Sequence, residues 1–146
     1  MLKPDAVRRR LAGEIIQRFE KAGFRIVSMK MLKPSKELVE KHYSNLVNQY
    51  EREKALSLQK KLVAFVSSGE VVAMLLEGNG AIKNVRRIVG STMPSDAQAG
   101  TIRGDYSIDS GDLADSEGRA VENLIHASGN VEEALFEIGL WFPDVK

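Results

Sequence analysis

The longest uninterrupted apolar run in this chain covers residues 71–76 and has the sequence VVAMLL. A membrane-spanning helix needs roughly 20 apolar residues, so this run is far too short to form one. A short continuous apolar run that is followed by a glycine, here Gly78, is typical of a β-strand buried on both faces. We therefore expect a strand at this position and no association with a membrane.

Apolar residues elsewhere recur at the spacing of strands or helices. The sequence FRIVSMKML predicts a second strand over 24–32, and the opening MLK is interpreted as the end of another strand, because Pro4 cannot donate to a strand ladder. Helical spacing predicts further helices, which begin near Leu11, Ser35, Leu56, Asn79, Ser116 and Asn130. Most of these starting positions hold Ser or Asn, which commonly cap helix N-termini.

The order of these elements indicates the fold class. Residues 90–115 are rich in Ser, Asp, Gly and Pro, which predicts a long loop of the kind that is more often functional than idle. Strands interleaved with helices favour a two-layer α+β domain. At 146 residues the chain is long enough for one domain with a core and too short for two, so we expect a single domain over 1–146.

The charge of the chain argues against a specific nucleic-acid partner. The formal net charge of +1 provides no field that would steer the protein to nucleic acid. Basic residues cluster at 8–10, 60–61 and 83–87, but each cluster taken alone is more typical of a solvated surface. The first ten residues carry charge early and contain no apolar stretch of signal-peptide length, which predicts a cytoplasmic protein.

His126 is the main candidate for chemistry. It lies in NLIHASGN, between an apolar run and a turn of small residues. The chain has no cysteine, no G-x-x-x-x-G-K-[ST] phosphate loop and no H-E-x-x-H zinc motif, which excludes the chemistry that depends on each of them. A lone histidine beside an apolar stripe is more often a structural residue than a catalyst, so spacing alone leaves both interpretations open.

Four stretches of the sequence resemble the nucleoside diphosphate kinase family. They are LKPDAV at 2–7, EIIQRFEKAGFRIV at 14–27, GSTMPSDAQAGTIRGDY at 90–106, and NLIHAS at 123–128 followed by EIGLWF at 137–142. They occur in the family's order over nearly the whole chain. The resemblance implies a ferredoxin-like α+β sandwich, with an antiparallel sheet covered by helices, and assembly into a homo-oligomer, either a hexamer or a tetramer.

The resemblance also implies a reaction. In this family the histidine of the N-x-x-H-x-S string takes the γ-phosphoryl group of a nucleoside triphosphate and passes it to a nucleoside diphosphate by a ping-pong mechanism. The matching residue is His126. An imidazole that is neutral near pH 7 is a suitable nucleophile for reversible phosphoryl exchange. Ser128 and Glu137 match the pair that orients this histidine.

The remaining site residues follow from the same resemblance. Lys3 matches the lysine that contacts the transferred phosphoryl group. Arg86, Thr92 and Arg103 match the residues that hold the phosphates, which suits the charge of a phosphoryl-transfer transition state.

Two further residues match positions on the nucleoside side of the family's site. Asn123 matches the residue near the sugar hydroxyls. Tyr43 matches a tyrosine that lines the site, although a core role is nearly as consistent with its helical spacing. The resemblance implies Mg²⁺ as the cofactor, bridging nucleotide phosphates without a dedicated protein cage.

The sequence departs from the family pattern in four places. Residues 48–61 replace the usual Pro-Phe-Phe element, so we assign no residue to a base platform. The stretch Ser107 to Val121 is longer than usual, and Gly129 stands where an aspartate commonly follows the serine. Both ends are short against the family. A catalytically impaired nucleotide-binding or scaffold module on the same fold is therefore the alternative, but every phosphate-handling position is filled, which favours the kinase.

Overall fold

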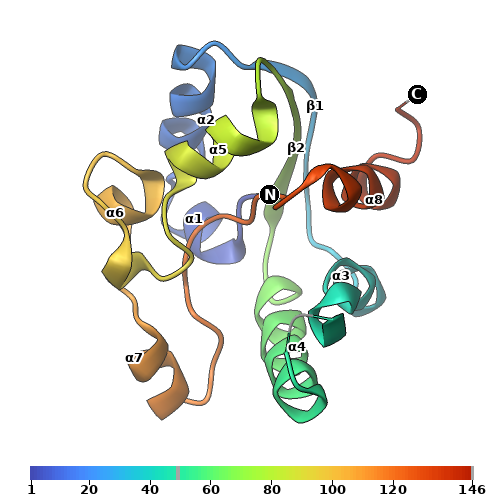
Figure 1. Cartoon of the computed structure of the whole chain (residues 1–146), viewed down its shortest axis with the longest axis vertical. Helices are drawn as coiled ribbons and strands as arrows, with labels where there is room; N and C mark the ends of the chain where they lie inside the picture. The colour runs from blue at the N-terminus through green and yellow to red at the C-terminus, as the bar shows by residue number, and fades with distance from the viewer. Residues whose placement is uncertain (49, 146) are drawn as a thin grey trace.

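The computed structural model describes residues 1–48 and 50–145 (Figure 1). The described residues form the following α-helices, 3₁₀ helices (η) and strands: α1 (Pro4–Arg8), α2 (Ala12–Lys21), β1 (Arg25–Leu32), α3 (Lys36–His42), η1 (Ser44–Asn48), α4 (Arg52–Val66), β2 (Val71–Glu77), α5 (Ala81–Val89), η2 (Pro94–Asp96), α6 (Ile102–Tyr106), α7 (Gly111–Ser116) and α8 (Val131–Trp141).

The sheet is antiparallel and lies between two groups of helices. β1 pairs with β2 in a register that runs from Arg25 opposite Glu77 to Leu32 opposite Val71. In Figure 1, α2 and α5 lie on one side of these strands, and α3 and α8 on the other. This arrangement confirms the predicted α+β class with a small antiparallel sheet covered by helices.

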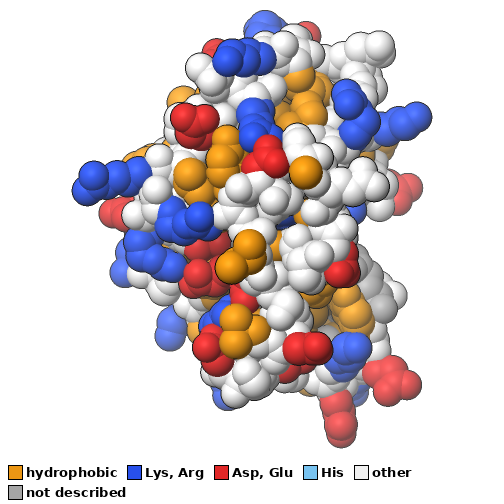
Figure 2. Space-filling model, turned by 90° about the vertical axis from the view of Figure 1, so that its left-hand side faces the viewer, with side chains coloured by type: hydrophobic (Ala, Val, Ile, Leu, Met, Phe, Trp, Pro, Cys, Tyr) orange, Lys and Arg blue, Asp and Glu red, His pale blue; other side chains and the backbone are white. Residues whose placement is uncertain are grey.

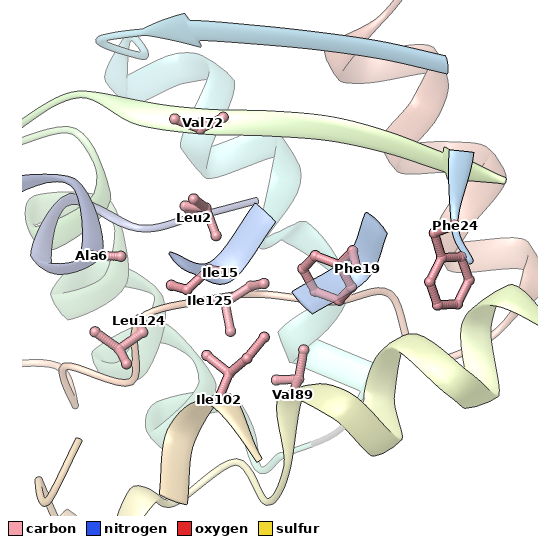
Figure 3. Packing of buried hydrophobic residues seen from close by; sticks show 10 residues of the cluster. All are labelled: Leu2, Ala6, Ile15, Phe19, Phe24, Val72, Val89, Ile102, Leu124 and Ile125. Carbon is pink, nitrogen blue, oxygen red and sulfur yellow. The ribbon is translucent and has the colours of Figure 1, made fainter. Parts of the chain in front are cut away.

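Leu2 extends the sheet at its second edge. It forms antiparallel bridges to Val72 on one side and to Ile125 on the other, so the start of the chain lies between β2 and the segment that leads to α8. Leu2 is fully buried, as Figure 3 shows for the cluster around it. The first residues of the chain therefore hold the histidine-bearing segment against the sheet.

Alternate residues of β2 enter two different apolar clusters. Val72 packs with residues of α2 and α5 in the cluster of Figure 3, and the partly buried Met74 and Leu76 pack against that cluster. Val71 and Ala73 pack on the opposite face with residues of α3, α4 and α8. The prediction that the run 71–76 is a strand buried on both faces is thereby confirmed.

The bridges of Leu2 confirm that MLK ends a strand, but helix α1 was not predicted, and α4 begins at Arg52 instead of near Leu56. Pro4 begins α1, because proline suits the first position of a helix, where a backbone N–H has no intrahelical acceptor. The helix predicted from Ser35 ends at His42 and continues as η1, although its cap is correct, since the Ser35 hydroxyl accepts from the Leu38 N–H. The cap of α5 is Gly80 with φ 54°, and not Asn79.

The stretch predicted to be a long loop contains short helices. η2, α6 and most of α7 fall within residues 90–115. Thr101 caps α6 by accepting from the Gly104 N–H, and Ser110 caps α7 by accepting from the Leu113 N–H. These helices are five and six residues long, which is too short to show apolar periodicity.

The helix predicted to start at Ser116 does not exist. Ser116 is the last residue of α7, and residues 120–125 are not helical. Ala120 packs in the cluster beside α8, whereas Leu124 and Ile125 pack in the cluster beside α2, so their spacing reflects burial on two sides of a non-helical segment. The last helix does begin at Asn130, whose side chain accepts from the Glu133 N–H.

The surface carries both signs of charge. Figure 2 shows basic and acidic side chains interleaved over the face that it presents, in line with the small net charge. Within residues 1–48 and 50–145, none of the helices combines the length and the apolar character needed to span a membrane.

Gly104 provides a test of the packing around α6. A Cβ atom at this position would lie 2.0 Å from the backbone oxygen of Gln98, which cannot move aside without shifting the chain. We expect Gly104→Ala to lower stability by about 3 kcal/mol, or Tm by about 10 °C in thermal unfolding. Gly139→Ala in α8 is the control, because its Cβ would meet no atom within 4 Å, and it is expected to be neutral or stabilising. Equal Tm values for the two variants would contradict this account.

Candidate active site

His126 is held by the backbone of the first residue. The His126 N–H donates to the Met1 carbonyl at 2.8 Å, and the Met1 amino group donates to the His126 carbonyl at 2.8 Å. Just before it, Leu124 adopts φ 68°, and its N–H donates to the buried Asp5 carboxylate at 2.9 Å. These contacts fix where the imidazole leaves the backbone.

Glu137 fixes the orientation of the imidazole. His126 Nε2 lies 2.6 Å from Glu137 Oε1, and the Ser128 hydroxyl donates to Glu137 Oε2 at 2.5 Å. An ionised carboxylate only accepts hydrogen bonds, so the proton of the neutral ring sits on Nε2. Nδ1 of His126 is therefore left with an unshared electron pair.

The surroundings keep this imidazole neutral. Burial lowers the pKa of His126 well below its usual value, and the amino terminus, Lys3 and Arg103 lower it further. About one fifth of the His126 side chain remains exposed. The ring is thus unprotonated at Nδ1 near neutral pH and still open to a substrate, which suits a nucleophile.

His42 is a neighbour of His126 that the sequence did not reveal. The two rings meet edge to face, with centroids 4.5 Å apart and an interplanar angle of 83°. The indole N–H of Trp141 donates to His42 Nδ1 at 3.1 Å. Burial, followed by the nearby His126, lowers the pKa of His42 to about 3. In the sequence, the only indication of this role is that His42 falls among the apolar positions of the helix predicted from Ser35.

Lys3 brings a positive charge to the site from the start of α1. Its backbone N–H donates to the Leu124 carbonyl at 2.8 Å, and its Nζ donates to Asn123 Oδ1 at 2.8 Å. Burial and the nearby Arg103 lower the pKa of Lys3 to about 8. Lys3 and His126 are therefore positioned by backbone hydrogen bonds between the same two segments, residues 1–3 and 124–126.

Arg103 connects the histidine segment to the chain that follows α5. Its guanidinium donates to the carbonyls of Asn123 and Ile125 on the histidine segment, and to those of Gly90 and Ser91 after α5. Burial, and then the charge of Arg86, lower the pKa of Arg103 to about 10. Most of its N–H groups donate to backbone carbonyls. Arg103 therefore holds the segments of the site together and also adds a positive charge to it.

Arg86 and Thr92 lie at the exposed side of the site. Arg86 extends from α5 and donates to the Ala127 carbonyl at 3.1 Å, with its side chain open to solvent. The Thr92 carbonyl accepts from the Asn123 side-chain amide at 2.8 Å. Arg86 therefore reaches the histidine segment from α5, and Thr92 reaches it from the chain between α5 and α6.

A cleft of about 420 Å³ joins these residues. Seven of the nine predicted site residues line it: Lys3, Tyr43, Arg86, Thr92, Arg103, Asn123 and His126. Ser128 and Glu137, the other two, line a separate cavity that also touches His126. The predicted site residues, which are spread over positions 3–137 of the sequence, are thus brought close together.

The cleft also has an apolar wall that the sequence did not predict. Leu46, Leu58, Leu62 and Val121 line it together with Tyr43. Tyr43 is buried, its hydroxyl has no hydrogen-bond partner among the described residues, and burial raises its pKa. The cleft can therefore accept a ligand that is anionic at one part and flat and apolar at another.

The buried His42 makes stability depend on pH. Its pKa is about 3 in the folded chain and near 6.5 when unfolded, so between these values the unfolded chain binds more protons and acidification favours unfolding. We expect the free energy of unfolding to fall as pH is lowered from 6.5 towards 3. The variant His42→Gln, which keeps an acceptor for Trp141, is expected to lose less over that range. Urea unfolding at several pH values measures both, and parallel curves would contradict the assignment.

Comparison with known proteins places this site in a family. A family model described as nucleoside diphosphate kinase matches residues 1–146. A nucleoside diphosphate kinase from Pyrobaculum aerophilum is 45% identical over 170 aligned residues, which cover 99% of this chain and 93% of that protein. One from Prochlorococcus marinus is 47% identical over 141 residues, which cover 97% of this chain and 82% of that protein.

Solved structures agree with the sequence matches. The crystal structure of an NDP kinase from Pyrobaculum aerophilum is similar with a TM-score of 0.89 at 43% identity, and covers 98% of this chain and 93% of its own. A transition-state mimic of the Borrelia burgdorferi nucleoside-diphosphate kinase, with bound vanadate and ADP, gives a TM-score of 0.92 at 38% identity, covering 98% and 84%. With matches of this extent, and with a neutral histidine set among cations in a cleft, the chain belongs to the nucleoside diphosphate kinase family.

Proposed function

We propose that His126 is the nucleophile with which this nucleoside diphosphate kinase carries the phosphoryl group. In the first half-reaction Nδ1 forms a bond to the γ-phosphorus while the bond from that phosphorus to the β–γ bridging oxygen breaks, and a nucleoside diphosphate leaves. In the second, a terminal oxygen of another diphosphate displaces Nδ1. The observation that carries the proposal is the contact of Nε2 with Glu137, which leaves Nδ1 free beside the cleft.

Glu137 has a second role in this scheme. Once Nδ1 is bonded to phosphorus and Nε2 keeps its proton, the ring carries a positive charge. The carboxylate 2.6 Å from Nε2 stabilises that charge, and the Ser128 hydroxyl holds the other carboxylate oxygen in place. We therefore assign Glu137 and Ser128 to the positioning of the nucleophile.

We assign the phosphates to the cations that border the cleft. Lys3, Arg86 and Arg103 can neutralise the charge that spreads over the phosphoryl oxygens in a loose transition state. Lys3 is suited to the transferred group because the same segment of backbone positions it and His126. Arg86 is the more exposed of the two arginines, and we assign it with Thr92 to the distal phosphates.

We assign the nucleoside to the remaining wall of the cleft. We assign Asn123 to the sugar hydroxyls because it lines the cleft, where hydrogen bonds with Lys3 and Thr92 hold its amide group in place. Tyr43 and the aliphatic residues Leu46, Leu58 and Leu62 offer a surface for the base. An apolar surface can pack against any base, which favours broad tolerance among nucleotides.

A divalent metal enters this proposal as part of the substrate. Among the described residues, the one group with three suitable donors is His42, His126 and Glu137, whose atoms lie within 4.8 Å of one another. Nitrogen ligands of this kind do not suit Mg²⁺, which prefers oxygen and retains water. We therefore propose that Mg²⁺ is bound by the nucleotide phosphates and arrives with them.

We also propose that the chain forms a homo-oligomer, a hexamer or a tetramer. Large apolar side chains remain exposed on the single chain, including Met29 and Met31 on β1 and Ile108 before α7. Burying such side chains against another copy would remove them from water. A cytoplasmic location remains an expectation from the sequence.

The phosphoenzyme tests the nucleophile directly. After incubation with Mg·ATP and removal of nucleotide, we expect intact-mass measurement to show one acid-labile phosphoryl group, which GDP discharges as GTP. His126→Gln is expected to lose both the phosphoryl group and turnover, and to retain its circular dichroism and its binding of ADP. Phosphorylation of the His126→Gln variant, or nucleotide binding without a phosphoenzyme in the original chain, would contradict the proposal.

The contribution of Arg86 to nucleotide binding can be distinguished from that of its neighbour Arg87 on α5. A charge-assisted contact to phosphate contributes about 1.5–3 kcal/mol, so Arg86→Ala is expected to raise the Kd for ADP on the order of 10- to 100-fold. Arg87→Ala is the matched control, because Arg87 is also exposed and does not line the cleft. Calorimetric titration with ADP measures both variants, and an equal effect of the two would show that net charge alone is responsible.

A further inference from the structure

Leu124 adopts a backbone conformation that leucine rarely takes. Its φ is 68°, and among the described residues the only other non-glycine residue with positive φ is Arg10. The Ile125 N–H donates to the Asn123 carbonyl at 2.8 Å, so residues 123–125 form a γ-turn centred on Leu124. A γ-turn with positive φ at its centre is strained, because the Cβ of an L-amino acid crowds the following carbonyl oxygen. The turn therefore needs contacts that hold it in place.

Packing explains why glycine does not occupy the centre of this turn. The Leu124 side chain is fully buried in the cluster of Figure 3, which also contains Ala6 and Ile102. Glycine would adopt the positive φ without strain, but it would leave a cavity in that cluster. The position thus requires a large apolar side chain and an unfavourable backbone conformation at the same time.

Both backbone groups of Leu124 have partners near the start of the chain. Its carbonyl accepts from the Lys3 N–H at 2.8 Å, and its N–H donates to Asp5 Oδ2 at 2.9 Å. A hydrogen bond to a carboxylate is stronger than one to a neutral acceptor. Among the partners of the turn, Asp5 is therefore well suited to offset the strain at Leu124.

Asp5 itself is buried beneath the site and does not reach it. Its side chain lines neither the cleft nor the cavity behind His126, and the residue is only 1% exposed. Its Oδ1 has no hydrogen-bond partner among the described residues, and burial raises the pKa of the carboxyl group, although the Leu124 N–H and Lys3 oppose that rise. An aspartate is rarely buried so fully without a specific partner, and here that partner is the turn.

The turn determines how two site residues are placed relative to one another. Asn123 precedes Leu124 and His126 follows it by two residues, and both line the cleft. A change of φ at Leu124 would rotate the chain on one side of the turn against the other, and would move the imidazole relative to Glu137 and Lys3. A displacement of about 1 Å at a reacting group can lower a rate on the order of 100-fold.

We propose that Asp5 is a positioning residue for phosphoryl transfer, because its carboxylate holds Leu124 in the strained γ-turn that directs His126 to the cleft. The inference rests on the proposed role of His126 as the nucleophile. Asp5 acts through the backbone of the turn and does not touch the nucleotide.

Two substitutions of Asp5 test this inference. Asp5→Ala removes the acceptor for the Leu124 N–H, whereas Asp5→Asn keeps an oxygen that can accept it. In single-turnover measurements with saturating Mg·ATP, we expect Asp5→Ala to slow phosphorylation of His126 on the order of 10- to 100-fold, and Asp5→Asn to slow it less than about threefold. The Kd for ADP, measured by calorimetry, is expected to change less than about threefold in both variants, because the residues assigned to the distal phosphates lie outside the turn.

Ile15→Ala distinguishes positioning from a general loss of stability. Ile15 is fully buried in the same cluster and lines neither the cleft nor the cavity behind His126. We expect this variant to lower Tm and to leave the single-turnover rate constant unchanged, because that constant describes the folded molecules alone. A rate reduced as much by Ile15→Ala as by Asp5→Ala would overturn the proposal.

Leu124→Gly tests the strain itself. Since glycine adopts a positive φ without strain, adding Asp5→Ala to this variant is expected to slow phosphorylation by less than about threefold. A further reduction as large as in the original chain would contradict the inference. If the glycine variant does not fold, amide hydrogen exchange of Leu124 decides. We expect it to be on the order of 10-fold faster in Asp5→Ala than in Asp5→Asn, and equal exchange would overturn the proposal.

The same measurements distinguish this inference from the proposed function. Equal single-turnover rates in the original chain, Asp5→Asn and Asp5→Ala would overturn the positioning role alone. The absence of a phosphoenzyme from the original chain would overturn the proposed function, and with it the inference that depends on it.

Discussion

The site depends on one carboxylate. Glu137 accepts from the imidazole of His126 with one oxygen and from Ser128 with the other, and this contact determines which ring nitrogen is free to react. Glu137 is placed by α8, whose start is fixed by the Asn130 cap, whereas His126 is placed by the edge of the sheet. The orientation of the nucleophile therefore requires that the last helix and the first residues of the chain are both in position.

Positively charged groups lie close together around His126, which lowers the stability of the folded chain. The pKa values of Lys3, Arg103 and His126 are all lowered, first by burial and then by one another or by their charged neighbours. Such a set is less favourable without an anion than with one, because each charge is desolvated and partly opposed. A nucleotide polyphosphate would supply the missing negative charge, which supports the proposal that these residues bind it.

Regular elements could be predicted where local sequence decides them. The run 71–76 and the caps Ser35 and Asn130 act through neighbouring residues, and the structure has them as expected. The non-helical residues 120–125 could not be predicted, because their apolar spacing serves two separate clusters. The site residues could be predicted only from the resemblance to a family. The place of His42 beside the site could not be predicted, because it depends on contacts with Trp141 and His126, which are distant in the chain.

Arg103 has a consequence for the energetics of the whole protein. Its guanidinium joins the chain after α5 to the histidine segment through backbone carbonyls, so the two walls of the cleft cannot separate without breaking these bonds. Local opening of α6 would disrupt the proposed nucleotide site and the edge of the sheet together. Ligand occupancy and resistance to opening are then thermodynamically linked, and the nucleotide concentration in a cell becomes one determinant of how long the chain stays folded.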